Sequence, residues 1–382
     1  MSEQLSQYDE IRPYSPEELP AVLSELLEDP MFTAIVQNFF QGVPVEALKA
    51  KMLSCRNNLE FQKAFIYPLI KQLLAKNCTG LTFESALAPT KRYTYVSNHR
   101  DIVLDSALLS IVLIENGFED TPEIAIGDNL LIYPWIKKLV RVNKSFIVQR
   151  SLSMREMLES SRRMSSYMHY AINEKQQSIW IAQREGRAKD SNDRTQESVL
   201  KMMAMGGEGT PTERLKSLNI APLSISYEYD PCDYLKAQEF QQKRDNPDFK
   251  KSREDDLKNM QTGIFGYKGQ VHYQVAPCIN EWIDEMSTLP KGEFFSAVAQ
   301  RMDADIFRNY RLYPGNYVAA DLLESNTRFA SHYTEEQKQQ FEKYVQSRIA
   351  LVELPNPDTA YLRERILEMY ANPVLNQLSV QQ

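Results

Sequence analysis

Residues 93–105 read Tyr93-Thr94-Tyr95-Val96-Ser97-Asn98-His99-Arg100-Asp101-Ile102-Val103-Leu104-Asp105. The first five residues are aromatic, β-branched or small, a composition typical of a buried strand. An apolar run follows from Ile102 to Ile114, interrupted by Asp105. The stretch therefore predicts a strand, a short polar turn and a helix over residues 101–115. A histidine in such a turn lies at the carboxyl end of the strand, where open α/β folds place their sites.

The same alternation of β-type runs and helical patterns continues on the carboxyl side of this stretch. The further predicted strands are Glu123–Ile126, Ser145–Val148, Ser178–Ile181, Ala221–Tyr227 and Gly269–Val275. Helical patterns lie between them, over residues 154–174 and 197–204. The sequence therefore predicts an α/β fold in which helices wrap a central, mostly parallel or mixed sheet.

The two ends of the chain are predicted to be helical extensions of this sheet domain. Residues 1–80 carry four helical patterns, the first preceded by the capping box Ser15-Pro16-Glu17-Glu18. The others cover about 31–40, 44–51 and 59–76. We place the α/β domain at residues 81–285 and a C-terminal helical extension at residues 286–382.

Within the C-terminal extension, Thr334 caps one predicted helix and residues 358–369 hold another. Residues from Ala371 onward are expected to fray. Inside the α/β domain, residues 239–258 carry 12 charges in 20 residues. We expect this segment to be a solvated helical or loop insertion.

Composition excludes several classes of protein. The chain has 44 basic and 51 acidic residues, a net charge of −7, so a global positive field for nucleic acid is absent. None of its four cysteines lies in a C-x-x-C pair, which excludes a zinc knuckle or dithiol site and favours reduced thiols in a cytoplasmic protein. The start is polar, and no apolar run reaches the roughly 20 residues that a spanning helix needs. We therefore expect a cytoplasmic protein that does not cross a membrane.

His99 is the candidate catalytic residue among four histidines, because His169, His272 and His332 lie in ordinary helix, strand and loop surroundings. A carboxylate bound to one ring nitrogen fixes the tautomer and leaves the other nitrogen as a base. Two carboxylates, Asp101 and Asp105, stand in reach. Spacing alone also permits a plain alternative, with Asp101 as a helix cap and His99 as a turn residue.

Four blocks of residues, in order, resemble the glycerolipid acyltransferases, the family of glycerol-3-phosphate and 1-acylglycerol-3-phosphate acyltransferases. The first block is residues 97–105. The second is Gly127-Asp128-Asn129-Leu130 with Phe146-Ile147-Val148-Gln149-Arg150, the third is Glu185-Gly186-Arg187-Ala188-Lys189, and the fourth is Ala221-Pro222-Leu223-Ser224-Ile225-Ser226-Tyr227-Glu228. Residues 81–285 are accordingly identified as an acyltransferase domain.

The resemblance implies transfer of a fatty acyl group from acyl-CoA or acyl carrier protein to a hydroxyl of glycerol-3-phosphate or a lysophospholipid. It implies that His99 is the general base, a role that contributes roughly 10²–10⁴-fold. The acceptor attacks directly, without an acyl-enzyme on Ser97, and no metal or organic cofactor is expected. Backbone N–H groups at the start of the following helix are expected to stabilise the oxyanion. The expected substrate-binding residues are Arg150, Glu185, Gly186, Arg187 and Lys189, of which the three cations would hold a phosphate.

Three departures from the family pattern leave alternatives open. Five residues separate His99 from Asp105, where the family has four, so Asp105 is the favoured partner and Asp101 its rival. The third block is one residue short, and Gln149 stands in place of an arginine. The alternatives are an acyltransferase that acts on another acceptor, such as an amino-acid lipid or a glycolipid, and a catalytically inactive lipid-binding protein.

Residues 129–144 add a prediction about membranes. They combine an aromatic and aliphatic set with Lys137, Lys138, Arg141 and Lys144, and contain no acidic residue. Such a segment is typical of a helix that lies on anionic lipid, which would place the protein on the inner face of the membrane. A core helix with solvated lysines is the alternative.

Overall fold

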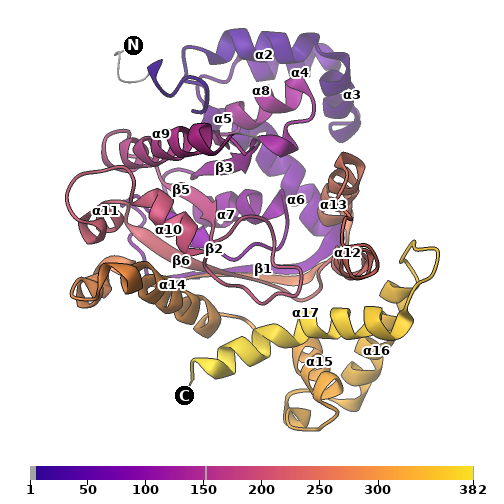
Figure 1. The fold of residues 1–382 in the computed structure, drawn as a ribbon. Coiled ribbons are helices and arrows are strands. Elements are labelled where there is room, and N and C mark those ends of the chain that lie inside the picture. The colour runs from indigo at the N-terminus through magenta and orange to yellow at the C-terminus, as the bar shows by residue number, and fades with distance from the viewer. Residues whose placement is uncertain (1–5, 151–152, 382) are drawn as a thin grey trace.

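A seven-stranded mixed sheet forms the centre of the computed structural model, which describes residues 6–150 and 153–381 (Figure 1). Its strands are β1 (Cys78–Ser85), β2 (Thr94–Ser97), β3 (Glu123–Gly127), β4 (Ser145–Val148), β5 (Ile179–Ala182), β6 (Ile220–Tyr227) and β7 (Gly269–Val275). They lie in the order β1-β7-β6-β2-β5-β3-β4, and every neighbouring pair is parallel except β6 and β7. The predicted α/β class with a mostly parallel, mixed sheet is confirmed.

The register of the parallel strands brings their carboxyl ends to one edge of the sheet. Ser97, the last residue of β2, lies opposite Ala182 of β5 and Leu223 of β6. Gly127 of β3 lies opposite Val148 of β4. The first three blocks therefore lie at or just beyond the carboxyl ends of β2, β3, β4 and β5, at one edge of the sheet, and the fourth block lies along β6.

Helices cover both faces of the sheet, and the alternation of side chains along each strand divides the core between them. Val96 of β2 packs into the cluster formed with α9 (Met154–Asn173), α10 (Glu197–Met203), α11 (Pro211–Ser217) and α14 (Lys291–Arg308). Tyr95, the preceding residue, packs into the cluster on the opposite face, with α6 (Tyr67–Asn77) and α7 (Leu104–Glu115). The predicted helices of the α/β domain are confirmed, with α7 beginning three residues later than expected.

The N-terminal helices form a separate small core at the top of Figure 1, together with α8 (Pro134–Val142). They are α2 (Leu19–Glu28), α3 (Pro30–Phe39), α4 (Val45–Leu53) and α5 (Asn58–Phe61), followed by the π-helical turn η1 (Gln62–Ile66) that leads into α6. The predicted capping box is only half formed, because Glu18 accepts from the N–H of Ser15 at 2.6 Å and also binds Arg12. Helix α2 consequently begins at Leu19 and not beside Ser15.

The C-terminal helices α15 (Pro314–Glu324), α16 (Glu335–Ile349) and α17 (Thr359–Ser379) have their own core, shared with α12 (Asp233–Asp245). The capping box at Thr334 is confirmed. The expectation that the chain frays from Ala371 is wrong, because α17 continues to Ser379. Ala371 and Val374 are buried in the C-terminal core, which holds this part of the helix in place.

The charged segment 239–258 contributes the end of α12 and the start of α13 (Arg253–Phe265). It is helical, and exposed or partly exposed over most of its length, as expected for a solvated insertion, but it also makes buried contacts. Glu239 and Gln241 are buried, and so is Asn259 on α13. Strand β1, which was not predicted, pairs with β7 at the edge of the sheet.

The basic residues of segment 129–144 bind protein partners in the structure. Lys138 pairs with Glu25 at 2.7 Å, and the guanidinium of Arg141 donates to the carbonyl of Arg12 at 2.8 Å. Lys144 pairs with Asp120. On the apolar side, Trp135 and Phe32 have ring centroids 6.0 Å apart within the N-terminal core. The arrangement matches the alternative of a core helix, with Lys137 exposed.

In residues 6–150 and 153–381, no helix combines the length and the hydropathy needed to cross a bilayer. The remaining short helical turns are η2 (Asp128–Leu130), η3 (Ile279–Glu281), η4 (Ile283–Met286) and η5 (Ala330–His332).

Candidate active site

The first-block loop connects β2 to α7 and is shaped by Asp101. One carboxylate oxygen of Asp101 accepts from the N–H groups of Val103 and Leu104, at 2.9 and 2.8 Å. A side chain that caps two successive N–H groups starts a helix. Asp101 therefore binds the backbone at the start of α7, which begins at Leu104.

His99 and Asp105 form the central pair of the site. Nδ1 of His99 lies 2.8 Å from Oδ2 of Asp105, and the two side chains are 14% and 0% exposed. The same Oδ2 accepts from the N–H groups of Arg100 at 2.6 Å and Asp101 at 3.0 Å. Oδ1 of Asp105 accepts from the hydroxyl of Tyr227 at 3.1 Å. The carboxylate is therefore held by four donors, one of which is the imidazole.

The structure decides between the two candidate partners of His99 in favour of Asp105. Asp101 bonds to the start of α7 and not to the imidazole. Burial, followed by the charge of neighbouring Asp105, raises the pKa of Asp101. Its Oδ2 faces Gly263 of α13, where an added Cβ would come within 2.0 Å of that oxygen. Asp101 thus joins the first-block loop to the insertion helix.

The imidazole of His99 is oriented for proton transfer. Its ring meets Trp180 edge-on, with centroids 5.8 Å apart. The indole N–H of Trp180 donates to the hydroxyl of Ser97 at 3.0 Å, and Ser97 is fully buried, so it is not presented as a nucleophile. Within the described part of the chain, Nε2 of His99 has no hydrogen-bond partner. With Nδ1 bound to Asp105, the other ring nitrogen is left to accept a proton.

The backbone N–H groups around the start of α7, where an oxyanion site was expected, are partly engaged within the protein. The N–H groups of Arg100 and Asp101 donate to Asp105, and those of Val103 and Leu104 donate to Asp101. These four groups are occupied by the protein's own carboxylates. The spacing of the sequence could not predict this engagement, because it did not show that both aspartates bind backbone N–H groups. If only one aspartate did so, two of the four N–H groups would be unbound.

The second block supplies an exposed cation. The backbone N–H of Arg150 donates to Asp128 at 3.2 Å, and its guanidinium lies 3.6 Å from the carboxylate of Glu185. Gly127 at the end of β3 permits this approach, because a Cβ there would lie 2.9 Å from Nε of Arg150. The side chains of Arg150 and Glu185 are 36% and 72% exposed, so a ligand could displace their contact.

The third-block loop turns at Gly186, whose φ of +67° lies in the left-handed region that favours glycine. Beyond this turn Arg187 donates to the side chain of Asn259 at 2.9 Å, and Lys189 pairs with Glu239. Both partners belong to the insertion helices. Burial lowers the pKa of Lys189 to about 8, and its hydrogen bond with Glu239 offsets only part of that effect.

The structure therefore brings His99, Asp105 and Asp101 into one loop, and places Arg150 and Glu185 in contact with each other. It engages Arg187 and Lys189 with α13 and α12. Sequence reasoning missed the role of Tyr227, although the Tyr-Glu ending of the fourth block was visible. It also missed Tyr273 of β7, whose hydroxyl donates to the backbone carbonyl of Asp105 at 2.9 Å.

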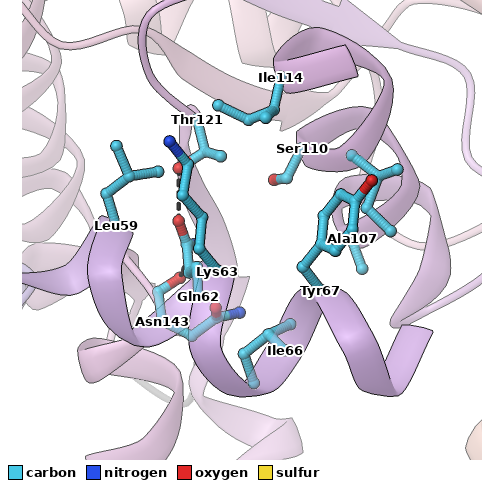
Figure 2. Close-up of a pocket in the computed structure, with 11 residues that line it drawn as sticks. Leu59, Gln62, Lys63, Ile66, Tyr67, Ala107, Ser110, Ile114, Thr121 and Asn143 are labelled. Carbon is cyan, nitrogen blue, oxygen red and sulfur yellow. Dashed lines mark hydrogen bonds between the residues drawn. The ribbon is translucent and has the colours of Figure 1, made fainter. Parts of the chain in front are cut away.

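A small pocket lies beside the helix that carries Asp105. Figure 2 shows it between η1, the start of α6 and the outer turns of α7, with the hydroxyl of Thr121 bonded to Gln62 at 2.6 Å. Its free volume is about 30 Å³, and none of the predicted site residues lines it. A space of that size holds one or two waters, not an acyl chain.

Comparison with known proteins gives a family for the part of the chain that contains these blocks. Residues 80–225 match the model of the family described as Acyltransferase. No curated protein matches the sequence. One similar solved structure is the 1-acyl-sn-glycerophosphate (LPA) acyltransferase PlsC from Thermotoga maritima, at 11% identity and a TM-score of 0.37, over 75% of this chain and 95% of that chain.

The family match begins in β1 and ends in β6, so it covers the histidine, the carboxylate and three of the four blocks in full. The predicted resemblance to an acyltransferase family is confirmed for residues 80–225, which match its model.

Proposed function

We propose that this protein transfers a fatty acyl group from an acyl thioester to a hydroxyl of glycerol-3-phosphate or a lysophospholipid such as 1-acylglycerol-3-phosphate. The observation that carries the proposal is the 2.8 Å contact between Nδ1 of His99 and Asp105 inside the segment that matches the family. Acyl-CoA and acyl carrier protein are the candidate donors.

The geometry supports a single-displacement reaction. Asp105 binds the N–H at Nδ1 of His99, so Nε2 carries the lone pair that removes the proton of the acceptor hydroxyl. The oxygen attacks the thioester carbonyl, and a tetrahedral intermediate forms. Its collapse breaks the carbon–sulfur bond, and the thiolate takes the proton from Nε2. A positioned base of this kind supplies roughly 10²–10⁴-fold.

The phosphate of the acceptor is assigned to Arg150, whose guanidinium is exposed and only loosely paired. Arg187 supports this assignment less directly, since its Nη1 is buried without a partner among the described residues while Nη2 binds Asn259. Lys189 is neutralised by Glu239. That neutralisation favours a second candidate, an acceptor without a phosphate, such as an amino-acid lipid or a glycolipid.

The proposal places the reaction at the inner membrane surface, because a lysophospholipid acceptor resides in a bilayer. Exposed apolar side chains on and near the N-terminal helices support this placement, among them Met31 at 49%, Ile35 at 39% and Tyr133 at 38% exposure.

An acceptor screen tests the function. The full chain would be incubated with labelled palmitoyl-CoA or palmitoyl acyl carrier protein and with glycerol-3-phosphate, 1-acylglycerol-3-phosphate or phosphate-free acceptors. We expect His99→Ala to lower kcat by roughly 10²-fold or more with an unchanged melting temperature. His332→Ala, which changes a histidine stacked on Tyr317, is the matched control and should keep the rate within about twofold. A wild-type rate for His99→Ala would contradict the mechanism, and lipid binding without turnover by the wild type would indicate the inactive lipid-binding protein.

A further inference from the structure

Asp193 lies directly behind the catalytic loop. It belongs to the segment between β5 and α10, and it is fully buried. Its Oδ2 lies 2.7 Å from the guanidinium of Arg100 and 3.5 Å from the amide nitrogen of Asn98. Asn98 and Arg100 are the two neighbours of His99, so one carboxylate oxygen reaches both sides of the histidine.

Both neighbours are tied at a second point. The side-chain amide of Asn98 donates to the carbonyl of Ile225 at 2.9 Å, and its oxygen accepts from the N–H of Ile225 at 2.8 Å, which fixes it to β6. The backbone N–H of Arg100 donates to Asp105 at 2.6 Å. Arg100 thus connects two carboxylates. Its guanidinium binds Asp193, and its backbone N–H binds Asp105, the partner of His99.

The third donor to Asp193 comes from the C-terminal part of the chain. The hydroxyl of Tyr310, two residues beyond the end of α14, donates to the same Oδ2 at 2.6 Å, and its ring lies 5.8 Å from the guanidinium of Arg100. Asp193, Arg100 and Tyr310 are all buried. The contacts join segments that are 95 and 117 residues apart in sequence.

We propose that Asp193 is a positioning residue for His99, and that Tyr310 holds Asp193 in place for this task. The proposal rests on the proposed function, in which His99 is the base. A buried guanidinium that loses its counter-charge must move or draw in water. Movement of Arg100 would carry its N–H away from Asp105, and the imidazole would lose its fixed orientation. Small displacements of a catalytic group are enough to cost about 10²-fold in rate.

The competing explanation is that Asp193 only stabilises the packing of the C-terminal helices. That role would change the melting temperature without changing the imidazole of the folded protein. Two readouts separate the explanations: kcat against KM with palmitoyl-CoA and glycerol-3-phosphate, and the ring ¹⁵N signals of His99. Labelling of histidine is practical because the chain has only four.

The experiment compares Asp193→Asn and Tyr310→Phe with Tyr333→Phe as the matched control. Tyr333 also donates its hydroxyl to a buried carboxylate, Asp321, at 2.7 Å, but this pair lies within the C-terminal core. We expect Asp193→Asn to lower kcat about 10²-fold and Tyr310→Phe about tenfold, with KM for palmitoyl-CoA within about threefold. Both should shift the His99 ring signals, whereas Tyr333→Phe should change neither the rate nor those signals.

Wild-type kcat and wild-type His99 signals in folded Asp193→Asn would overturn the proposal. If that variant does not fold, the same result in Tyr310→Phe would overturn it. The ring signals are measured without substrate, so they test the positioning role even if glycerol-3-phosphate is not the acceptor. Full activity of His99→Ala would contradict the proposed function. The His99 ring signals of the wild type and of Asp193→Asn would still report whether Asp193 orients His99.

Discussion

The first-block loop, residues 97–105, and the third-block loop, residues 185–189, follow neighbouring strands but obtain their contacts in different ways. In the first loop, the pairing of His99 with Asp105 and the cap formed by Asp101 are made within nine residues of sequence. In the third loop, Arg187 and Lys189 bind Asn259 and Glu239, 72 and 50 residues away.

The contacts of the first loop are therefore made by residues close together in sequence, whereas those of the third loop depend on the insertion helices. A histidine and carboxylate in one loop meet wherever the strand-turn-helix forms. The cations of the third block bind side chains that helices α12 and α13 supply.

The largest expected effect belongs to the first loop. Asp105→Asn should lower kcat by about 10²-fold, because an amide at this position permits the wrong tautomer of His99. Asp101→Asn should keep most of the rate, since asparagine caps a helix about as well as aspartate. Steady-state kinetics of the two variants gives the ranking, and the reverse order would assign the positioning role to Asp101.

Gly263 lies against Asp101 of the first loop, on helix α13, whose Asn259 binds Arg187 of the third loop, and an alanine there should be costly. The added Cβ would lie 2.0 Å from Oδ2 of Asp101, so either the loop or α13 must shift. We expect Gly263→Ala to lower the free energy of unfolding by about 1–3 kcal/mol, measured by urea denaturation. Gly292→Ala is the control, because a Cβ there meets nothing within 4 Å. Equal stability of the two variants would mean that Asp101 and α13 are not tightly packed.

The third prediction ranks the cations of the acceptor site. Arg150→Ala should raise KM for glycerol-3-phosphate about tenfold, since a charge-assisted contact is worth roughly 1.5–3 kcal/mol. Lys189→Ala should raise it less than about threefold, because Glu239 already holds Lys189. Glu239→Gln removes the charge that offsets the burial of Lys189, so the pKa of the lysine should fall further and KM for the same acceptor should not decrease. If Lys189→Ala has the larger effect, the contact with Glu239 must open when substrate binds.

The smallest expected effect concerns pH. Burial raises the pKa of Asp303 to about 6, although two hydrogen bonds from Thr195 lower it. Thr195 lies in the segment after the third block. The folded protein therefore binds this proton more tightly than the unfolded chain, and stability falls as pH rises from about 4 to about 6. We expect this loss of stability in the wild type and not in Asp303→Asn, measured by denaturation at each pH. Parallel pH curves for the two proteins would contradict it.

The fold was predictable to the extent that strands have apolar, β-branched runs. Strands β2 to β7 have such runs, and parallel pairing then gathers the ends that carry the blocks. Strand β1 has no such apolar run. It lies at the edge of the sheet, and the residues of Cys78–Ser85 are partly exposed or exposed. The helical length of α17 was underestimated since its last turns are held by tertiary packing of Ala371 and Val374, not by local pattern.

The site was predictable only within its loops. The spacing of the sequence left two possible partners for His99, Asp101 and Asp105. The structure has the pair His99–Asp105. No periodicity or spacing relates Asp193 to Tyr310, or Gly263 to Asp101, because these contacts join segments that meet only in the folded chain. The engagement of Lys189 by Glu239 was hidden for the same reason, inside a segment whose charge density suggested solvent.

The antiparallel pairing of β6 with β7 has a consequence for how the catalytic unit is delimited. Tyr227 and Tyr273, one from each of these strands, hold the carboxylate and the backbone carbonyl of Asp105. The family match ends at residue 225, before either tyrosine. The segment that matches the family is therefore shorter than the segment that must fold to hold His99 in place. A fragment that ends at residue 225 would keep His99 but lose the two tyrosines that bind Asp105.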